Sequence, residues 1–168
     1  MKKSVFLKIT SSQYEEKLQP NGEAFVRELE LEDSIEICTE GVLYDKENAT
    51  YILYEESKEM GMENMKTLLK LKDEELHIRR YTKEADDDMD MVLKQGMLNI
   101  TRYKAPMLPG MDIEIYTNKM QHELDDEGYG TIYVDYKIKF DQIFSRRNIL
   151  EIEVKPTESL SIKGGGKA

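Results

Sequence analysis

Apolar and more polar residues alternate along much of the chain, which is the period of a β-strand with one buried and one wet face. Leu150, Ile152 and Val154, for example, alternate with charged residues. Segments of the same kind occupy residues 5–10, 35–40, 67–72, 76–81, 112–117, 131–140 and 150–155. Stripes with the period of a helix are almost absent, so the pattern predicts an all-β protein.

Turn-forming residues separate these segments, as one-sided antiparallel strands require. They occupy residues 45–48, 72–75, 95–96, 109–110 and 125–128. With residues 51–56, 89–94 and 98–104 included, the pattern predicts roughly eight to ten strands joined mainly by hairpins. An open sheet of that size exposes its edges, so we expect it to close into an antiparallel up-and-down barrel, with a β-sandwich as the alternative.

Residues 12–32 interrupt the alternation and leave two interpretations open. Residues 14–18 fit a short helical turn, and residues 24–31 either extend the following strand or form a short helix. We expect a long loop here, which can cover the mouth of a barrel. The rest of the chain shows no repeat, so we predict a single domain over residues 1–160 and a flexible, glycine-rich tail over residues 161–168.

The composition narrows the class of protein further. The 168 residues suit one domain with its own core, and the formal net charge of −10 repels nucleic acids and anionic membranes. No apolar run approaches the ~18 residues of a membrane span, and the basic start of the chain is interrupted by Lys8 and Thr10. The lone cysteine, Cys38, excludes an intramolecular disulfide. We therefore expect a cytoplasmic protein without a nucleic-acid or membrane partner.

Six short stretches, taken together in their order and spacing, resemble the YwiB-like family of small bacterial proteins. They are Thr39-Glu40-Gly41, Tyr54-Glu55-Glu56-Ser57, Gly61-Met62-Glu63 with Thr67 and Lys70, Ile78-Arg79-Arg80, Tyr103-Lys104-Ala105-Pro106, and Tyr116-Thr117. The resemblance implies a lipocalin-like (calycin-type) barrel able to hold a small ligand. It implies no catalytic residues, because the function of the family is not established.

The chain departs from the family pattern at three places. Tyr81-Thr82-Lys83 follows Arg80 where the family has a glycine, and Ala105-Pro106 stands where Thr-Pro is usual. The turn over residues 107–110 is slightly longer than usual. These differences concern loops and leave the implied barrel unchanged.

Arg80 is the first candidate for a functional residue. Alternation places it on the same face as Leu76 and Ile78, so we expect it to point into the barrel. A buried guanidinium is costly unless an anion or several acceptors meet it. The same alternation assigns four further polar residues to apolar faces, namely Thr39, Thr67, Thr117 and Tyr136.

Residues 51–56 can face either way, because Ile52, Tyr54 and Glu56 share one side and Tyr51, Leu53 and Glu55 share the other. If Glu56 faces inward, it is the natural partner of Arg80. That pair would fix strand register, whereas Arg80 without it would bind an anionic ligand. The leading hypothesis is a barrel that binds a small amphipathic or anionic ligand. The alternative is a filled barrel that acts through its surface, for instance as a homodimer.

Other chemistry has little support in the sequence. Cys38 could form a dyad with His77 or His122, but alternation turns it outward and no orienting residue is evident. Two distant histidines without a cysteine pair do not suggest a zinc site. The acidic run at residues 86–90 lacks the glycine and the final glutamate of a calcium loop. We predict no catalytic residues, no metal and no cofactor, and rank an enzyme as the third hypothesis.

Overall fold

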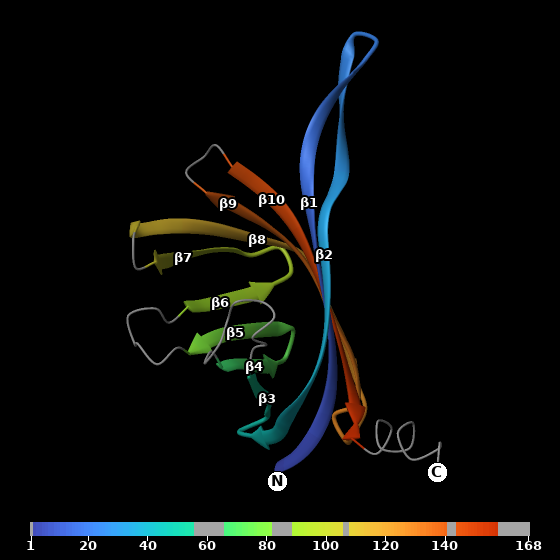
Figure 1. The fold of residues 1–168 in the computed structure, drawn as a ribbon, viewed down its shortest axis with the longest axis vertical. Helices are drawn as coiled ribbons and strands as arrows, with labels where there is room; N and C mark the ends of the chain where they lie inside the picture. Colours follow the sequence, from blue (N-terminus) through green and yellow to red (C-terminus); the bar gives the residue numbers. More distant parts are fainter. Residues whose placement is uncertain (1, 56–65, 82–88, 106–107, 141–143, 158–168) are drawn as a thin grey trace.

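A computed structural model of the chain describes residues 2–55, 66–81, 89–105, 108–140 and 144–157. Within these ranges the chain is almost entirely β-strand, and ten strands form one antiparallel sheet (Figure 1). The strands are β1 (Lys2–Asn21), β2 (Ala24–Lys46), β3 (Ala49–Glu55), β4 (Lys66–Lys72), β5 (Glu75–Tyr81), β6 (Met89–Lys94), β7 (Leu98–Ala105), β8 (Leu108–Leu124), β9 (Gly130–Phe140) and β10 (Phe144–Pro156). The predicted all-β, up-and-down architecture is confirmed, and the strands do not divide into the two sheets of a sandwich.

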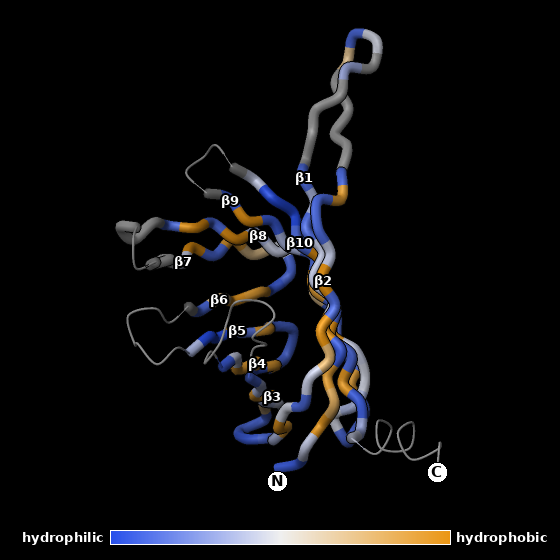
Figure 2. Tube along the Cα trace, in the orientation of Figure 1, coloured by the Kyte–Doolittle hydropathy of each residue, from blue (hydrophilic) through white to orange (hydrophobic). Residues whose placement is uncertain are grey.

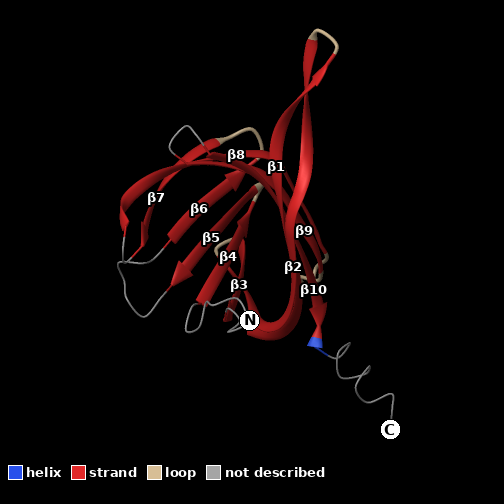
Figure 3. Ribbon diagram, turned by 45° about the horizontal axis from the view of Figure 1, so that its top comes forward, coloured by secondary structure: helices blue, strands red, loops and turns tan. Residues whose placement is uncertain are grey.

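The sheet curls into a nearly closed barrel (Figure 3). Its order is β6-β5-β4-β3-β2-β1-β10-β9-β8-β7, so the first and last strands pair and the seam falls between the consecutive strands β6 and β7. At this seam the Thr101 hydroxyl donates a hydrogen bond of 2.7 Å to the Asp90 carbonyl oxygen. A side chain therefore joins the two strands where the ladder of backbone bonds is interrupted.

The hydrophobic core lines the concave side of the sheet. Apolar and polar residues alternate along the strands, as Figure 2 shows by colour, because successive side chains of a strand point to opposite faces. The largest fully buried side chains come from every strand except β2 and β7 and include Leu7, Ile52, Leu69, Leu76, Leu93, Ile115, Ile132 and Ile152. The faces predicted from alternation for residues 5–10, 67–72, 112–117 and 150–155 are confirmed.

The prediction of a long loop over residues 12–32 is wrong, whereas the alternative that residues 24–31 extend a strand is confirmed. β1 continues to Asn21 and pairs with β2 as far as Ala24, with Gly22 in the turn at a φ of 68°. β10 accompanies β1 only to Glu15. The two strands beyond that point form a ribbon that projects from the barrel (Figure 1) and does not cover its mouth.

Most turns of the barrel lie where the sequence predicted them. Glu47 and Asn48 adopt the positive φ angles of a tight hairpin, 53° and 64°, as residues 45–48 predicted. The prediction of a turn at residues 109–110 is wrong, because Pro109 and Gly110 lie within β8, whose first residue, Leu108, pairs with Ala105 of β7. Residues 106–107, between β7 and β8, lie outside the described residues, as does the predicted tail.

Candidate functional site

One row of the predicted polar residues crosses three neighbouring strands on the concave side. Tyr54 of β3 pairs with Thr67 of β4, and Thr67 pairs with Arg80 of β5. Tyr54 and Thr67 are buried, and Arg80 is partly buried. The ambiguity over residues 51–56 is resolved, since Ile52 and Tyr54 face the core. Glu56, the predicted partner of Arg80, lies outside the described residues.

A second row crosses the opposite part of the sheet. Thr117 of β8 pairs with Tyr136 of β9, and Tyr136 pairs with Asn148 of β10. Thr117 and Asn148 are buried, and the Thr117 hydroxyl oxygen finds no hydrogen-bond partner in the described part of the chain. Sequence reasoning missed Asn148, because the recognised alternation began only at Leu150.

The two rows influence each other electrostatically across the barrel. Burial raises the pKa of the Tyr136 phenol above its usual range, and the positive charge of Arg80 acts in the opposite direction. Since β5 and β9 are far apart in the order of the sheet, this influence acts through the interior. The charge of Arg80 therefore acts on Tyr136 across the curved sheet, and both residues were predicted from alternation.

Thr39 lies nearer the edge of this region. It pairs with Leu7 but is only partly buried, and its hydroxyl donates a long hydrogen bond of 3.5 Å to the Glu40 carbonyl oxygen. Two residues further along β2, Gly41 is buried and pairs with Tyr54. Thr39 is thus placed beside the first row without belonging to it. Cys38 is exposed, as its outward orientation predicted.

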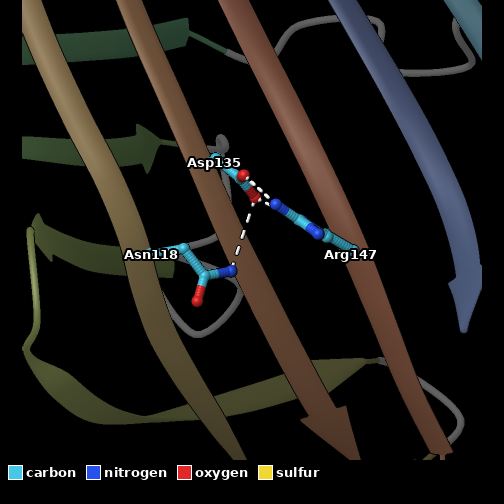
Figure 4. Close-up of polar contacts among 3 residues, drawn as sticks. All are labelled: Asn118, Asp135 and Arg147. Carbon is cyan, nitrogen blue, oxygen red and sulfur yellow. Dashed lines mark hydrogen bonds and ion pairs between the residues drawn. The ribbon is translucent and has the colours of Figure 1, made fainter. Parts of the chain in front are cut away.

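A polar cluster that the sequence did not reveal lies on the convex side (Figure 4). Asp135 stands between Val134 and Tyr136, so its side chain points away from the barrel interior. The side chain is nevertheless buried, and Arg147 Nε donates a hydrogen bond of 2.8 Å to one carboxylate oxygen while Arg147 Nη2 binds the other. Asn118 Nδ2 lies 3.4 Å from the first of these oxygens. Side chains from three adjacent strands, β8, β9 and β10, therefore meet at the Asp135 carboxylate.

Within this cluster, the negative charge of Asp135 is balanced by the positive charge of Arg147. Burial disfavours the ionised form of Asp135, but the bonds and charge of Arg147, together with Asn118, outweigh it and hold the pKa of that carboxyl below its usual range. The register between β8 and β9 shifts between Thr117 and Lys119, which accommodates Asn118. A carboxylate already bonded in this way stabilises the sheet and offers little to a ligand.

Metal and membrane sites can be considered over the same ranges. The described residues contain no group of three or more His, Cys, Asp or Glu side chains arranged to hold a metal ion. Nor do they contain a helix of the length and apolar character needed to cross a membrane. The Cys38 dyad has no supporting geometry, because Cys38 faces outward on β2.

Comparison with known proteins supports the fold. The family model described as "Domain of unknown function (DUF1934)" matches residues 23–152. The chain is similar to the crystal structure of the ywiB protein from Bacillus subtilis, with a TM-score of 0.62 and 20% sequence identity over 91% of this chain and 92% of that chain. At this identity the likeness shows a shared fold. A search of curated proteins found no match.

Proposed function

The chain belongs to the DUF1934 family of domains of unknown function, the YwiB-like family it resembles in sequence, and we propose that it binds a small amphipathic, anionic ligand inside its barrel. The observation that carries the proposal is that two rows of polar residues, one ending at Arg80 and one containing Tyr136, lie on the concave side of the sheet. We place this binding in the cytoplasm, in keeping with the lone cysteine.

The polar groups of the interior are suited to an anion. The guanidinium of Arg80 donates in a planar fork that matches carboxylate or phosphate. Because burial raises the pKa of Tyr136, its phenol stays protonated at neutral pH and can donate as well. The buried hydroxyl of Thr117, on the strand next to Tyr136, is a third donor. Three donors on the concave side of the sheet favour a ligand with an acceptor-rich, negatively charged group.

The rest of the concave side is suited to an apolar body. Leu69 and Ile78 are buried on the strands that carry Thr67 and Arg80, and Met91 follows on β6. Barrels of this size either hold one small ligand or are filled by their own side chains. A ligand with an anionic head and an apolar body would use both kinds of surface, whereas a filled barrel would exclude it.

Fluorescence titration with 1-anilinonaphthalene-8-sulfonate, an amphipathic anion, tests the anchor. We expect the Arg80→Leu variant to bind it roughly ten- to a hundredfold more weakly, as loss of a charge-assisted hydrogen bond predicts. The matched control is Arg79→Leu, because Arg79 is the exposed neighbour and its guanidinium lies over the Tyr81 ring. The control should bind like the original protein.

A second dye separates the charge from the apolar contact. N-phenyl-1-naphthylamine has a similar body without the sulfonate, so its affinity should be the same for the original protein and Arg80→Leu. Equal weakening of both dyes, or equal weakening by the Arg79 and Arg80 variants, would reject Arg80 as an anionic anchor. Native mass spectrometry of protein purified gently from its own cells would then show whether a natural ligand accompanies the barrel.

A further inference from the structure

The second row of polar residues continues from β10 onto two further strands. Asn148 pairs with Gln13 of β1, and Gln13 pairs with Asp33 of β2. Directly opposed residues of neighbouring strands lie on the same face of a sheet, so these two residues also belong to the concave side. We call Thr117, Tyr136, Asn148, Gln13 and Asp33 the polar row. Asn148 is buried, Gln13 is partly buried and Asp33 is exposed, so the row leads from the interior to solvent.

Apolar residues flank the buried part of the polar row on both sides. Ile115 lies two positions before Thr117 on β8, and Val134 lies two positions before Tyr136 on β9. Both of these apolar side chains are fully buried, as is Thr117, and Asn148 is only 5% exposed. Burial of a hydroxyl or an amide in such surroundings costs free energy unless the group is hydrogen-bonded. Thr117 and Asn148 are therefore better explained by a polar group that they bind.

The two buried side chains differ in what they require from a ligand. The Thr117 hydroxyl oxygen has no hydrogen-bond partner in the described part of the chain. The amide of Asn148 donates through its N–H groups and accepts through its carbonyl oxygen. A carboxylate or sulfonate only accepts hydrogen bonds, so beside Asn148 it would leave the carbonyl oxygen facing another acceptor. A ligand that satisfies the polar row must therefore carry a hydrogen-bond donor next to its charged group.

The charges near the polar row orient such a ligand. The positive charge of Arg80 opposes the burial that raises the pKa of Tyr136, so it acts on this part of the row. Asp33 lies three strands from Tyr136 along the row and accepts a hydrogen bond of 2.9 Å from the Ser34 backbone N–H. That donor is neutral, so the carboxylate keeps its charge. An anionic group is attracted by Arg80 and repelled by Asp33, which directs its neighbouring donor toward Asn148.

We propose that Asn148 is a specificity-determining residue of the barrel and selects an anion that carries an amide N–H or a hydroxyl between its charged group and its apolar body. The Asn148 carbonyl oxygen accepts from this donor, and the Thr117 hydroxyl donates to the charged group. This selectivity rests on the proposed binding of an amphipathic anion and narrows the class of that anion. An acyl chain joined to an acidic group through a secondary amide is a simple member of the class.

Three ligands of the same chain length separate the donor from the charge. N-lauroylglycine carries a carboxylate and an amide N–H, N-lauroylsarcosine has a methyl group in place of the amide hydrogen, and pentadecanoate has no amide. Their displacement of 1-anilinonaphthalene-8-sulfonate measures the affinities. We expect the original protein to bind N-lauroylglycine roughly tenfold more tightly than N-lauroylsarcosine, because the buried acceptor of Asn148 loses its donor in the second complex. This comparison requires no substitution in the protein.

Asn148→Leu tests the residue with little change in side-chain size. This variant should bind N-lauroylglycine roughly tenfold more weakly and pentadecanoate as before, so the preference for the secondary amide disappears. The matched control is Gln121→Leu, because Gln121 carries an exposed amide on β8. The control should keep the preference. Equal affinities of the original protein for N-lauroylglycine and N-lauroylsarcosine would overturn the proposal, as would equal weakening of all three ligands by Asn148→Leu.

Dependence on Arg80 distinguishes this selectivity from the proposed function. Arg80→Leu should weaken all three ligands alike, since each carries a carboxylate. Binding that depends on Arg80 without a preference for N-lauroylglycine would overturn the selectivity alone. Binding that does not depend on Arg80 would overturn the proposed function and the selectivity together, and failure of all three ligands to displace the dye would overturn the selectivity. Circular dichroism of each variant would show that the barrel is folded.

Discussion

Arg147 of β10 binds both carboxylate oxygens of Asp135 on β9, although the register sets Asp135 opposite Ile149. The contact is therefore diagonal, and it ties the two strands together on the convex side. Asp135 directly precedes Tyr136, whose side chain lies on the concave side. The pair thus fixes the strand that presents one of the candidate ligand-binding residues.

Replacement of Arg147 by leucine should lower the free energy of unfolding by roughly 2–3 kcal/mol at neutral pH, because a buried carboxylate loses its charged partner. Urea denaturation measures this change. The matched control is Arg146→Leu, since Arg146 makes a more exposed contact of 3.6 Å with Glu32. It should cost less than about 1 kcal/mol. Equal costs for the two variants would contradict the special role of the buried pair.

The effect of Arg147 should also depend on pH. The folded protein holds the pKa of Asp135 below its value in the unfolded chain, so the pair contributes its full stability above the unfolded value of about 4. That contribution is lost as the pH falls through the lower folded pKa, where Asp135 takes up a proton. The stability difference between the original protein and Arg147→Leu should therefore narrow in acid, whereas a constant difference would exclude titration of Asp135 as its source.

The candidate ligand-binding residues Arg80 and Tyr136 could be predicted, because the position of a residue within its own strand determines which face its side chain lies on. Arg80 follows Leu76 and Ile78 at intervals of two, and Tyr136 follows Ile132 and Val134 in the same way. The influence of Arg80 on Tyr136 depends on the closure of the sheet, which no single strand encodes. The Asp135–Arg147 contact depends on the register between two strands, which local alternation does not determine either.

The projecting ribbon of β1 and β2 beyond Glu15 was expected to be a loop for a different reason. Alternation is strong where one face of a strand is buried, and this ribbon lies beyond the barrel that would bury it. A register shift between Gln13 and Tyr14 also changes the alternation of the strands relative to the barrel. Ile35 shows the same limit, because it shares a face with Ile37 yet is 38% exposed. The alternation of apolar and polar residues identifies the face of a strand to which a side chain belongs. It does not establish how much of that face is buried.

Removal of the Arg80 charge should raise the pKa of Tyr136 further. Burial already raises it, and the guanidinium opposes that effect by favouring the phenolate. Nuclear magnetic resonance of ¹³C-labelled tyrosine, with Tyr136→Phe to assign the signal, can follow the titration. Arg80→Leu should shift the Tyr136 transition to higher pH, and Arg79→Leu should leave it in place. An unchanged transition in Arg80→Leu would show that the two residues do not interact across the barrel.

Gly130, at the start of β9, should not tolerate a side chain. Its φ is 149°, and a Cβ atom there would lie 1.8 Å from the carbonyl oxygen of Glu123. We expect Gly130→Ala to cost roughly 3 kcal/mol or more, because the backbone of the β8–β9 hairpin must move.

Gly96 is the matched control for this substitution, since its φ is 79° and the space around it is open. Gly96→Ala should cost only the roughly 1–2 kcal/mol of a left-handed residue. Thermal unfolding of both variants measures the difference. Similar melting temperatures would show that the contact with Glu123 relaxes without appreciable cost.

The seam of the barrel should open more easily without the Thr101 hydroxyl. That hydroxyl donates to the Asp90 carbonyl oxygen between β7 and β6, which are not joined by a backbone ladder in the described residues. Thr101→Val keeps the shape of the side chain but removes the donor, at a cost of about 1 kcal/mol or less. We expect hydrogen exchange to accelerate selectively in β6 and β7, because local opening needs less free energy than global unfolding.

Thr131→Val is the control for the seam, because Thr131 is an exposed threonine on β9, a strand that pairs with neither β6 nor β7. This variant should leave exchange in β6 and β7 unchanged. If Thr101→Val instead accelerates exchange equally in β1 and β10, the hydroxyl stabilises the whole barrel and not its seam. Selective opening would identify the gap between β6 and β7 as the route by which a ligand enters the interior, since β1 and β10 close the other side through continuous pairing from Val5 to Glu15.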